Sequence, residues 1–258
     1  MVLHRRCRNL FCLCVIGSCN ADEKAEVAVQ MILLAADTSG KNGSLALARV
    51  HGASTNATSA GLEVLELVPL EGGTFSAQLV PQISALLQKQ GLAKRDISGF
   101  AVVSGPGSFT GLRVGLAAIK ALAEILHKPI AAVSRLEAVA RSSALRGFVV
   151  GVIDAGRGEV YAGEYQLGSR STRLKERLLA KEEFFEEYRG QRIVVFDPAL
   201  ADAARSRALH PERVPEPRAD VIARLGWEKI QSGEIAAADE LEANYIRRSD
   251  AEIFAKPS

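Results

Sequence analysis

The 258-residue sequence is short of cysteines, aromatic residues and long apolar runs. Its 4 cysteines all fall between Cys7 and Cys19, so the body of the chain has no thiol, as is usual for a protein of the reduced cytosol. Aromatic residues make up 5% of the sequence, which leaves little material for stacking nucleobases. No apolar run reaches the roughly 18 residues that a membrane-spanning helix needs. The composition therefore predicts a cytoplasmic protein that does not span a membrane.

Histidine is also scarce, and its spacing offers no catalytic or metal site. The 4 histidines are His4, His51, His127 and His210, and no two of them stand at i and i+4. None adjoins a set of metal-ligating residues or a motif that would place it in a nucleophilic triad. We therefore predict no metal site and no catalytic residue.

The charge balance excludes a strong electrostatic attraction for nucleic acid or membrane, because the formal net charge is only +2. A hydrophobic content of 48% with 24% charged residues is ordinary for a globular protein. The length allows one large domain or two modest ones.

The most informative stretch predicts a buried strand, a tight turn and a long helix. The strand, Phe100–Ser104, is apolar almost throughout, as expected when both faces are covered. Glycine and proline at residues 105–107 end it, and Ser108 or Thr110 can cap the helix that follows. A turn before a helix N-terminus can bind an anion, although this one lacks the lysine of a Walker loop. A tight strand-to-helix joint is the favoured interpretation.

The helix predicted at Phe109–Leu126 is apolar around most of its circumference. A surface helix normally has a single apolar stripe, so this one must be covered on several sides. Gly111 and Gly115, one turn apart, would let another backbone approach closely. The helix is either a central core helix, or a helix covered by its own sheet on one side and by a partner subunit on another.

Two hairpins of similar design open the two halves of the chain. Strands at residues 32–36 and 44–50 flank a turn with Asp37, and strands at residues 148–154 and 159–165 flank a turn that follows Asp154. This internal repeat indicates two related halves. In the first turn, an Asp37 that caps its own backbone is the simpler explanation.

Hydrophobic periodicity predicts the remaining elements. The strands are expected at residues 62–70, 130–133 and 192–196, the first of them completing an antiparallel meander. The helices are expected at residues 75–90, 135–145 (capped by Ser134), 181–188, 198–208 and 220–232. The charged stretch before residue 181, from residue 169 onward, is predicted to be irregular.

Three segments carry a family resemblance: LLAADTS at residues 33–39, SGPGSFTGLRVG at 104–115 and IDAGRGEVY at 153–161. Together they closely resemble the TsaB (YeaZ) family, bacterial proteins required for making threonylcarbamoyladenosine in tRNA. The resemblance extends over Met31–Glu252 and implies an α/β fold, the duplicated ribonuclease-H-like fold of the actin-like ATPase superfamily, with mixed sheets. The implied domains are an N-terminal α/β domain at 31–134, with partner-binding helices, and a smaller C-terminal α/β domain with the tail at 135–258.

The resemblance also implies a function. TsaB is a non-catalytic subunit that pairs with and activates its catalytic paralogue TsaD, together with the ATPase TsaE, and a homodimer through the same surface is the expectation where TsaD is absent. TsaD carries a His-x-x-x-His metal pair that this sequence lacks. The resemblance implies no intrinsic cofactor. ATP or ADP is expected only at an interface shared between subunits, and tRNA is expected to be contacted only through the complex. The implied contact residues on the two helices of the first domain are Phe75, Leu79, Ile83, Gly111, Leu112, Val114, Gly115, Leu116 and Ile119.

Other functions stay open. In the actin-like superfamily the first hairpin lies beside nucleotide phosphates. Together with the turn before the long helix, it suggests a phosphate-binding set of Asp37, Thr38, Ser39, Gly105, Gly107 and Ser108. The alternative function is then a small-molecule kinase or ATPase that uses Asp37 and Asp154, although no adenine-binding segment can be placed. A third option, a lipid-anchored envelope protein, rests only on Cys19.

The two ends of the chain have several interpretations. Residues 1–30 are a mis-assigned start or disordered leader, an export signal with a lipoprotein-like box at Ile16–Cys19, or a metal or disulfide cluster without a matching second half. They are excluded from the predicted fold. Near the other end, Tyr245 and Ile246 are expected to pin a partly exposed segment, and Arg247 and Arg248 either contact phosphate or are solvated.

Overall fold

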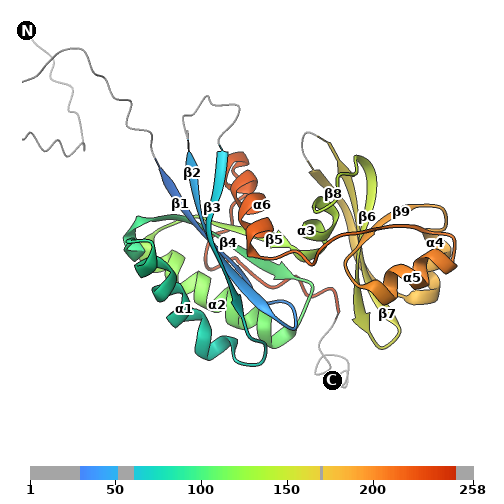
Figure 1. Ribbon diagram of the computed structural model, residues 1–258, viewed down its shortest axis with the longest axis horizontal. Helices are drawn as coiled ribbons and strands as arrows, with labels where there is room; N and C mark the ends of the chain where they lie inside the picture. The colour runs from blue at the N-terminus through green and yellow to red at the C-terminus, as the bar shows by residue number, and fades with distance from the viewer. Residues whose placement is uncertain (1–29, 52–60, 169–170, 248–258) are drawn as a thin grey trace, which may run out of the picture.

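The computed structural model describes residues 30–51, 61–168 and 171–247, arranged in two lobes that each contain one five-stranded sheet (Figure 1). Residues 1–29 lie outside the described part, and so do Cys19 and the interpretations of the leader. None of the helices in these ranges is both long and apolar enough to cross a membrane.

The sheet of lobe 1 has the strand order β3-β2-β1-β4-β5. Strands β1 and β2 pair antiparallel, as do β2 and β3, which confirms the predicted meander, whereas β4 and β5 are parallel to β1. The strands are β1 (Met31–Asp37), β2 (Gly43–His51), β3 (Gly61–Leu70), β4 (Ile97–Gly105) and β5 (Ile130–Ser134). Helices α1 (Phe75–Lys89) and α2 (Phe109–Leu126) cover one face, and a short 3-10 helix, Lys94–Asp96, precedes β4.

Lobe 2 repeats this arrangement, because its strand order β8-β7-β6-β9-β10 matches β3-β2-β1-β4-β5 position by position. Its strands are β6 (Gly147–Gly156), β7 (Glu159–Leu167), β8 (Ser171–Ala180), β9 (Arg192–Val195) and β10 (His210–Arg213). Helix α3 (Arg135–Arg141) packs on one face, and α4 (Lys181–Glu187) and α5 (Pro198–Ser206) pack on the other. The fold is a duplicated ribonuclease-H-like α/β fold, as predicted.

The β6 strand shows how the sequence determines these layers. Val150 and Val152 point into the core under α4 and α5, whereas Val149 and Ile153 point to the core under α3. Alternate residues of a strand face opposite sides of a sheet, so a run that is apolar throughout must be covered on both.

One helix crosses the predicted domain boundary. Helix α6 (Ala219–Ser232) follows lobe 2 in the chain, but it packs on the sheet of lobe 1, on the face opposite α1 and α2 (Figure 1). Its Ile222 and Trp227 are buried in the lobe 1 core. The division at residues 134 and 135 stays a prediction, and lobe 1 takes its second covering layer from the C-terminal part of the chain.

Two strands were missing from the sequence prediction. Residues 171–180, predicted to be irregular, form the edge strand β8, and β10 occupies the opposite edge. On β8, Arg173 and Lys175 are exposed, while Glu176 points inward to hydrogen bonds rather than to apolar contacts. A strand that buries a carboxylate does not show the apolar alternation by which strands are recognised.

The contact residues predicted on α1 and α2 lie mostly inside the subunit. Of the nine predicted, eight are buried inside the subunit, and only Val114 is half-buried. Gly111 and Gly115 do allow a close backbone approach, but the neighbour is Thr38 of the same chain, at the end of β1. Side chains packed in their own core offer a partner little surface, so the exposed and half-buried residues of this helix pair, Val114 among them, are the better contact candidates. Partner contact by the nine residues stays a prediction.

Candidate functional site

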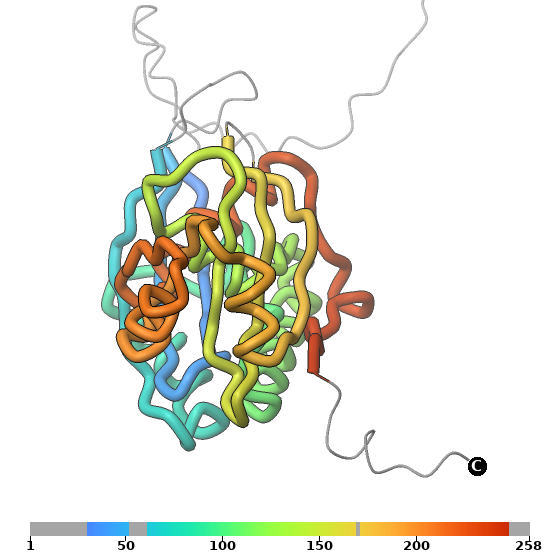
Figure 2. The backbone as a smooth tube through the Cα atoms, turned by 90° about the vertical axis from the view of Figure 1, so that its right-hand side faces the viewer, coloured from blue at the N-terminus to red at the C-terminus, as the bar shows by residue number. Residues whose placement is uncertain are grey.

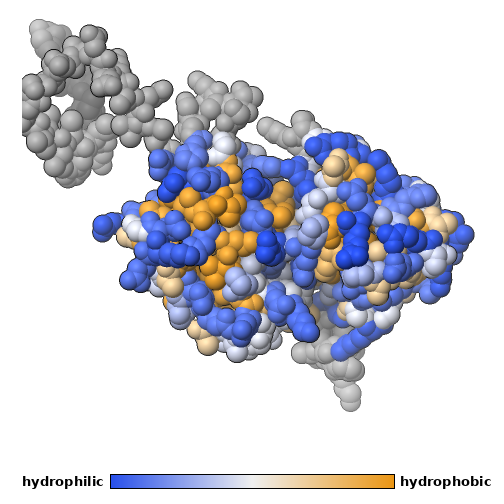
Figure 3. All heavy atoms as spheres, in the orientation of Figure 1, coloured by the Kyte–Doolittle hydropathy of each residue, from blue (hydrophilic) through white to orange (hydrophobic). Residues whose placement is uncertain are grey.

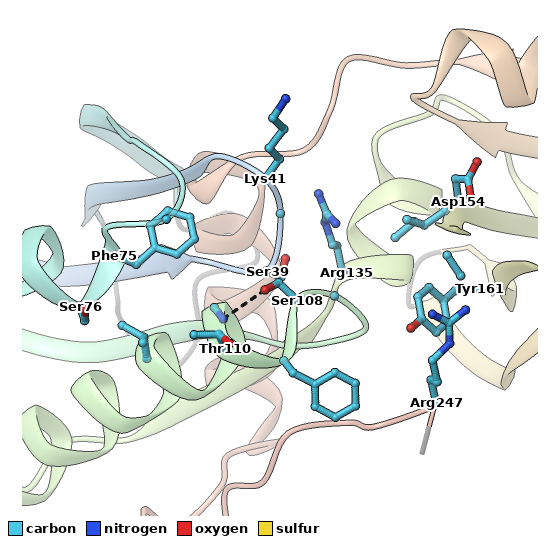
Figure 4. A pocket seen from close by; sticks show the side chains of 18 residues that line it. Ser39, Lys41, Phe75, Ser76, Ser108, Thr110, Arg135, Asp154, Tyr161 and Arg247 are labelled. Atoms are coloured by element: carbon cyan, nitrogen blue, oxygen red, sulfur yellow. Dashed lines mark hydrogen bonds between the residues drawn. The ribbon is translucent and has the colours of Figure 1, made fainter. Parts of the chain in front are cut away.

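The candidate ligand site is a cleft of about 520 Å³ between the two lobes. Ser39, Ser108 and Thr110 line it from lobe 1, and Asp154 and Tyr161 line it from lobe 2 (Figure 4). The two hairpin turns that the sequence analysis compared therefore face the same space, one from each lobe. The amino terminus of α2 forms part of the wall.

In the first turn, the polar groups are already bonded within the chain. Asp37 is 4% exposed, and one of its carboxylate oxygens accepts from the Ser39 N–H at 2.8 Å and the Ser39 hydroxyl at 2.6 Å. Thr38 donates its hydroxyl to the carbonyl of Gly111 at 2.7 Å. The turn is thus an aspartate-capped turn held against α2, as the simpler interpretation of the sequence expects.

The glycine-rich turn before α2 forms a tight strand-to-helix joint, as the sequence predicts. The Ser108 hydroxyl caps α2 by accepting from the Gly111 N–H at 3.3 Å, and the Ser108 N–H donates to the Ser39 carbonyl at 2.8 Å. Of the six predicted phosphate-binding residues, Ser39, Gly107 and Ser108 line the cleft; Asp37, Thr38 and Gly105 are not among its lining residues. Phosphate binding by this set stays a prediction.

The second turn carries an ionised carboxylate at the cleft wall. Burial acts to raise the pKa of Asp154, but hydrogen bonds from Lys181 Nζ at 2.8 Å and the Gly156 N–H at 2.7 Å outweigh it. The pKa of the Asp154 carboxyl is therefore held below its usual range. Its charge is compensated by Lys181 and is not free to hold a metal ion without displacing that lysine.

Three cations reach the cleft from three segments that are distant in sequence. Arg135, 7% exposed at the start of α3, donates to Glu216 at 2.6 Å, and Arg247 near the chain end pairs with Glu159. Lys41 adds a third positive charge. Sequence reasoning missed Lys41 and Arg135, which no motif contains, and Tyr161, which ends the IDAGRGEVY segment but was not assigned to a site. Only the packing of the lobes brings the three together.

The tail follows its expected anchoring. Tyr245 stacks on Phe109 and Ile246 packs against the lobe 2 core, as the pinned segment was expected to do. Arg247 is half-buried, pairs with Glu159 and lies over the ring of Tyr161, 5.8 Å from its centroid, so it is not simply a solvated arginine. Phosphate contact by Arg247 stays a prediction. Arg248 lies outside the described residues.

A second feature is the outward face of α1 and α2. On α2 it presents a stripe spaced at i, i+3, i+4, i+7, i+8 and i+11, and Ile125 at its end is 74% exposed. On α1, Val80 is 50% exposed. The stripe residues, exposed or half-buried, are Val114, Ala117, Ala118, Ala121, Leu122 and Ile125. We call this the outer helix face.

Lobe 1 shows further apolar surface at the edge strand β3, where Leu62, Val64 and Leu67 are only half-buried. In Figure 3, hydrophobic residues accordingly gather over lobe 1 more than over lobe 2. Within the described ranges, no group of three or more histidine, cysteine, aspartate or glutamate side chains is placed to hold a metal ion.

Comparison with known proteins places these features in context. Residues 72–191 match the family described as TsaD, tRNA N6-adenosine threonylcarbamoyltransferase. The tRNA threonylcarbamoyladenosine biosynthesis protein TsaB of Bacillus subtilis is 35% identical over 137 residues, covering 53% of this chain and 56% of the relative. The TsaB of Escherichia coli is 37% identical over 106 residues, covering 39% and 44%. The chain thus spans about half the length of these curated relatives.

Solved structures match over more of the chain. A Pseudomonas aeruginosa protein described as similar to peptidase YeaZ is 26% identical with a TM-score of 0.62, covering 84% of this chain and 100% of that one. YeaZ from the same organism is 25% identical with a TM-score of 0.60, covering 83% and 99%.

Proposed function

We propose, from the premise that this chain belongs to the TsaB (YeaZ) family, that it acts in the biosynthesis of tRNA threonylcarbamoyladenosine as a subunit without catalysis of its own. It pairs with and activates a catalytic paralogue of the TsaD kind, and a TsaE-like ATPase joins them. The protein works in the cytoplasm and meets tRNA only through the complex, in keeping with its net charge of +2.

The outer helix face is the observation that carries the proposal. Two adjacent helices expose a continuous row of small and aliphatic side chains, and such a surface on a folded protein is usually covered by a partner. Small residues let a second helix pair approach closely. Glu124 beside the stripe is the sole acidic residue of α2 and leaves the row itself uncharged.

The cleft supports an accessory role rather than an enzyme. Asp37 and Asp154 are the aspartates that a kinase or ATPase of this fold would use, yet Asp37 is bonded to Ser39 and Asp154 to Lys181. We therefore assign no intrinsic cofactor to the chain and place ATP or ADP, if bound at all, at an interface shared with the partners.

Reconstitution tests the proposed function. The full chain is combined with a TsaD-like protein, a TsaE-like ATPase, a threonylcarbamoyl-adenylate synthase, ATP, threonine, bicarbonate and unmodified tRNA. We expect modified adenosine, measured by mass spectrometry of tRNA nucleosides, only when the chain is present. Equal modification in its absence contradicts the proposal; ATP turnover by the chain alone, lost in Asp37→Ala, would support the kinase or ATPase alternative.

A charge on the outer helix face is expected to weaken pairing without unfolding the subunit. Ala121→Glu places a carboxylate in the middle of the exposed stripe, where burial by a partner would require its desolvation. We expect the affinity for the TsaD-like partner to fall at least about tenfold, as a penalty of 1.4 kcal/mol or more implies.

Isothermal titration calorimetry measures the affinity, and sedimentation measures any homodimer. Ala144→Glu, on an exposed alanine in the loop before β6, is the matched control and is expected to bind normally. Normal binding by Ala121→Glu would show that the partner docks elsewhere.

A further inference from the structure

The last described residues of the chain cross from one lobe to the other. The backbone passes from lobe 1 to lobe 2 at Ser134 and Arg135, and it returns between β10 and α6. After α6 it crosses a third time, because Leu241 is buried in the lobe 1 core and Ile246 packs against the lobe 2 core. Figure 2 shows this segment running down the side of the molecule.

On lobe 1, the segment is held by four contacts. Lys120 Nζ donates to the Leu241 carbonyl at 2.9 Å, and the Asn244 N–H donates to the Ser104 carbonyl at 2.7 Å. The ring of Tyr245 stacks on Phe109 with centroids 4.8 Å apart and planes at 10°, and its hydroxyl accepts from Arg113 Nε at 3.0 Å. These contacts fix the start of the segment to β4 and α2.

On lobe 2, the same residues reach a buried carboxylate. The Glu176 side chain is 5% exposed, and one of its oxygens accepts from the Asn244 side-chain amide at 2.7 Å. The other accepts from the Ser134 hydroxyl at 2.5 Å and from the Tyr165 hydroxyl. Burial and the neighbouring Glu176 raise the pKa of Tyr165, so its phenol stays protonated and donates.

Glu176 therefore joins three parts of the molecule. Ser134 is the residue at which the chain first leaves lobe 1, Tyr165 belongs to β7, and Asn244 belongs to the third crossing. A buried carboxylate is stable only when its lone pairs are satisfied, so losing one donor strongly disfavours this arrangement. Arg247, three residues after Asn244, makes a second contact with lobe 2 by pairing with Glu159, and it also lines the cleft.

We propose that residues 241–247 are a strap that fixes the angle between the lobes, and with it the width of the cleft, through Asn244–Glu176 and Arg247–Glu159. The strap is independent of the proposed tRNA function, because it rests on contacts within the chain. When its lobe 2 contacts are broken, the lobes hinge at the other two crossings.

Spin-label distances between the lobes test the strap. Nitroxides are attached at Ser84→Cys on α1 and Glu183→Cys on α4, both exposed, in a full chain whose 4 natural cysteines are replaced by serine. Asn244→Asp keeps the shape of the side chain but replaces the donor by a second carboxylate facing Glu176. Glu242→Gln is the matched control, since it changes an exposed side chain of the same segment that is not among these contacts.

We expect one narrow distance distribution for the parent chain and for Glu242→Gln, and a distribution at least twice as broad or shifted for Asn244→Asp. Circular dichroism confirms folding. If Asn244→Asp does not fold, Arg247→Gln is used in its place. It removes the ion pair with Glu159 at a half-buried site, and we expect the same change in the distance distribution. Parent-like distances in the folded variants would overturn the proposal.

Discussion

A glutamate in place of Leu116 is expected to unfold the protein rather than to weaken its association with a partner. Leu116 is 5% exposed and belongs to the lobe 1 core under α2. Truncation of a buried leucine alone costs about 2–5 kcal/mol, and a carboxylate left in its place adds the penalty of burying a charge. The sum is comparable to the about 5–15 kcal/mol by which folded proteins are stable.

Circular dichroism and urea unfolding measure this effect. The matched control is Ala117→Glu, one position along the same helix, whose side chain is exposed. The free energy of unfolding of the control is expected to lie within about 0.5 kcal/mol of the parent's, as is usual for surface substitutions. A folded Leu116→Glu would mean that this side of α2 does not face the sheet.

An alanine in place of Gly111 is expected to destabilise the fold by about 2–4 kcal/mol, although alanine is the better helix former. A Cβ at this position would lie 2.0 Å from the Thr38 carbonyl oxygen, which is backbone and cannot rotate away. Helix α2 would have to move from the end of β1, and the hydrogen bond from the Thr38 hydroxyl to the Gly111 carbonyl would be strained.

The control for Gly111→Ala is Gly61→Ala, where the same methyl group meets no atom of the described residues within 4 Å. Urea unfolding measures the free energy of unfolding of both variants. The difference between them gives the cost of the steric contact with Thr38, apart from the general effect of replacing a glycine. Stabilisation by Gly111→Ala, in line with helix propensity alone, would contradict the close approach of α2 to the first turn.

Only those contacts of the candidate site that form within one short segment of the chain could be predicted from the sequence. The capping of α2 by Ser108 and the self-capped turn at Asp37 follow from residues within four positions of each other, and the structure has both. The partners of Arg135 and Arg247 in the cleft are 81 and 88 positions away, so no local pattern could indicate them.

The sequence by itself determined the two hairpins, the buried strands and the length of α2, because alternation, glycine turns and caps act over a few residues. Only the tertiary structure decided which side of α2 is core. A helix that is apolar nearly all round has no preferred face, and the choice came from Gly111 and Gly115, whose missing side chains let the β1 turn approach on one side. The row from Val114 to Ile125 was thereby left outward. The same holds for the cleft and the strap, which exist because two lobes of one chain pack together.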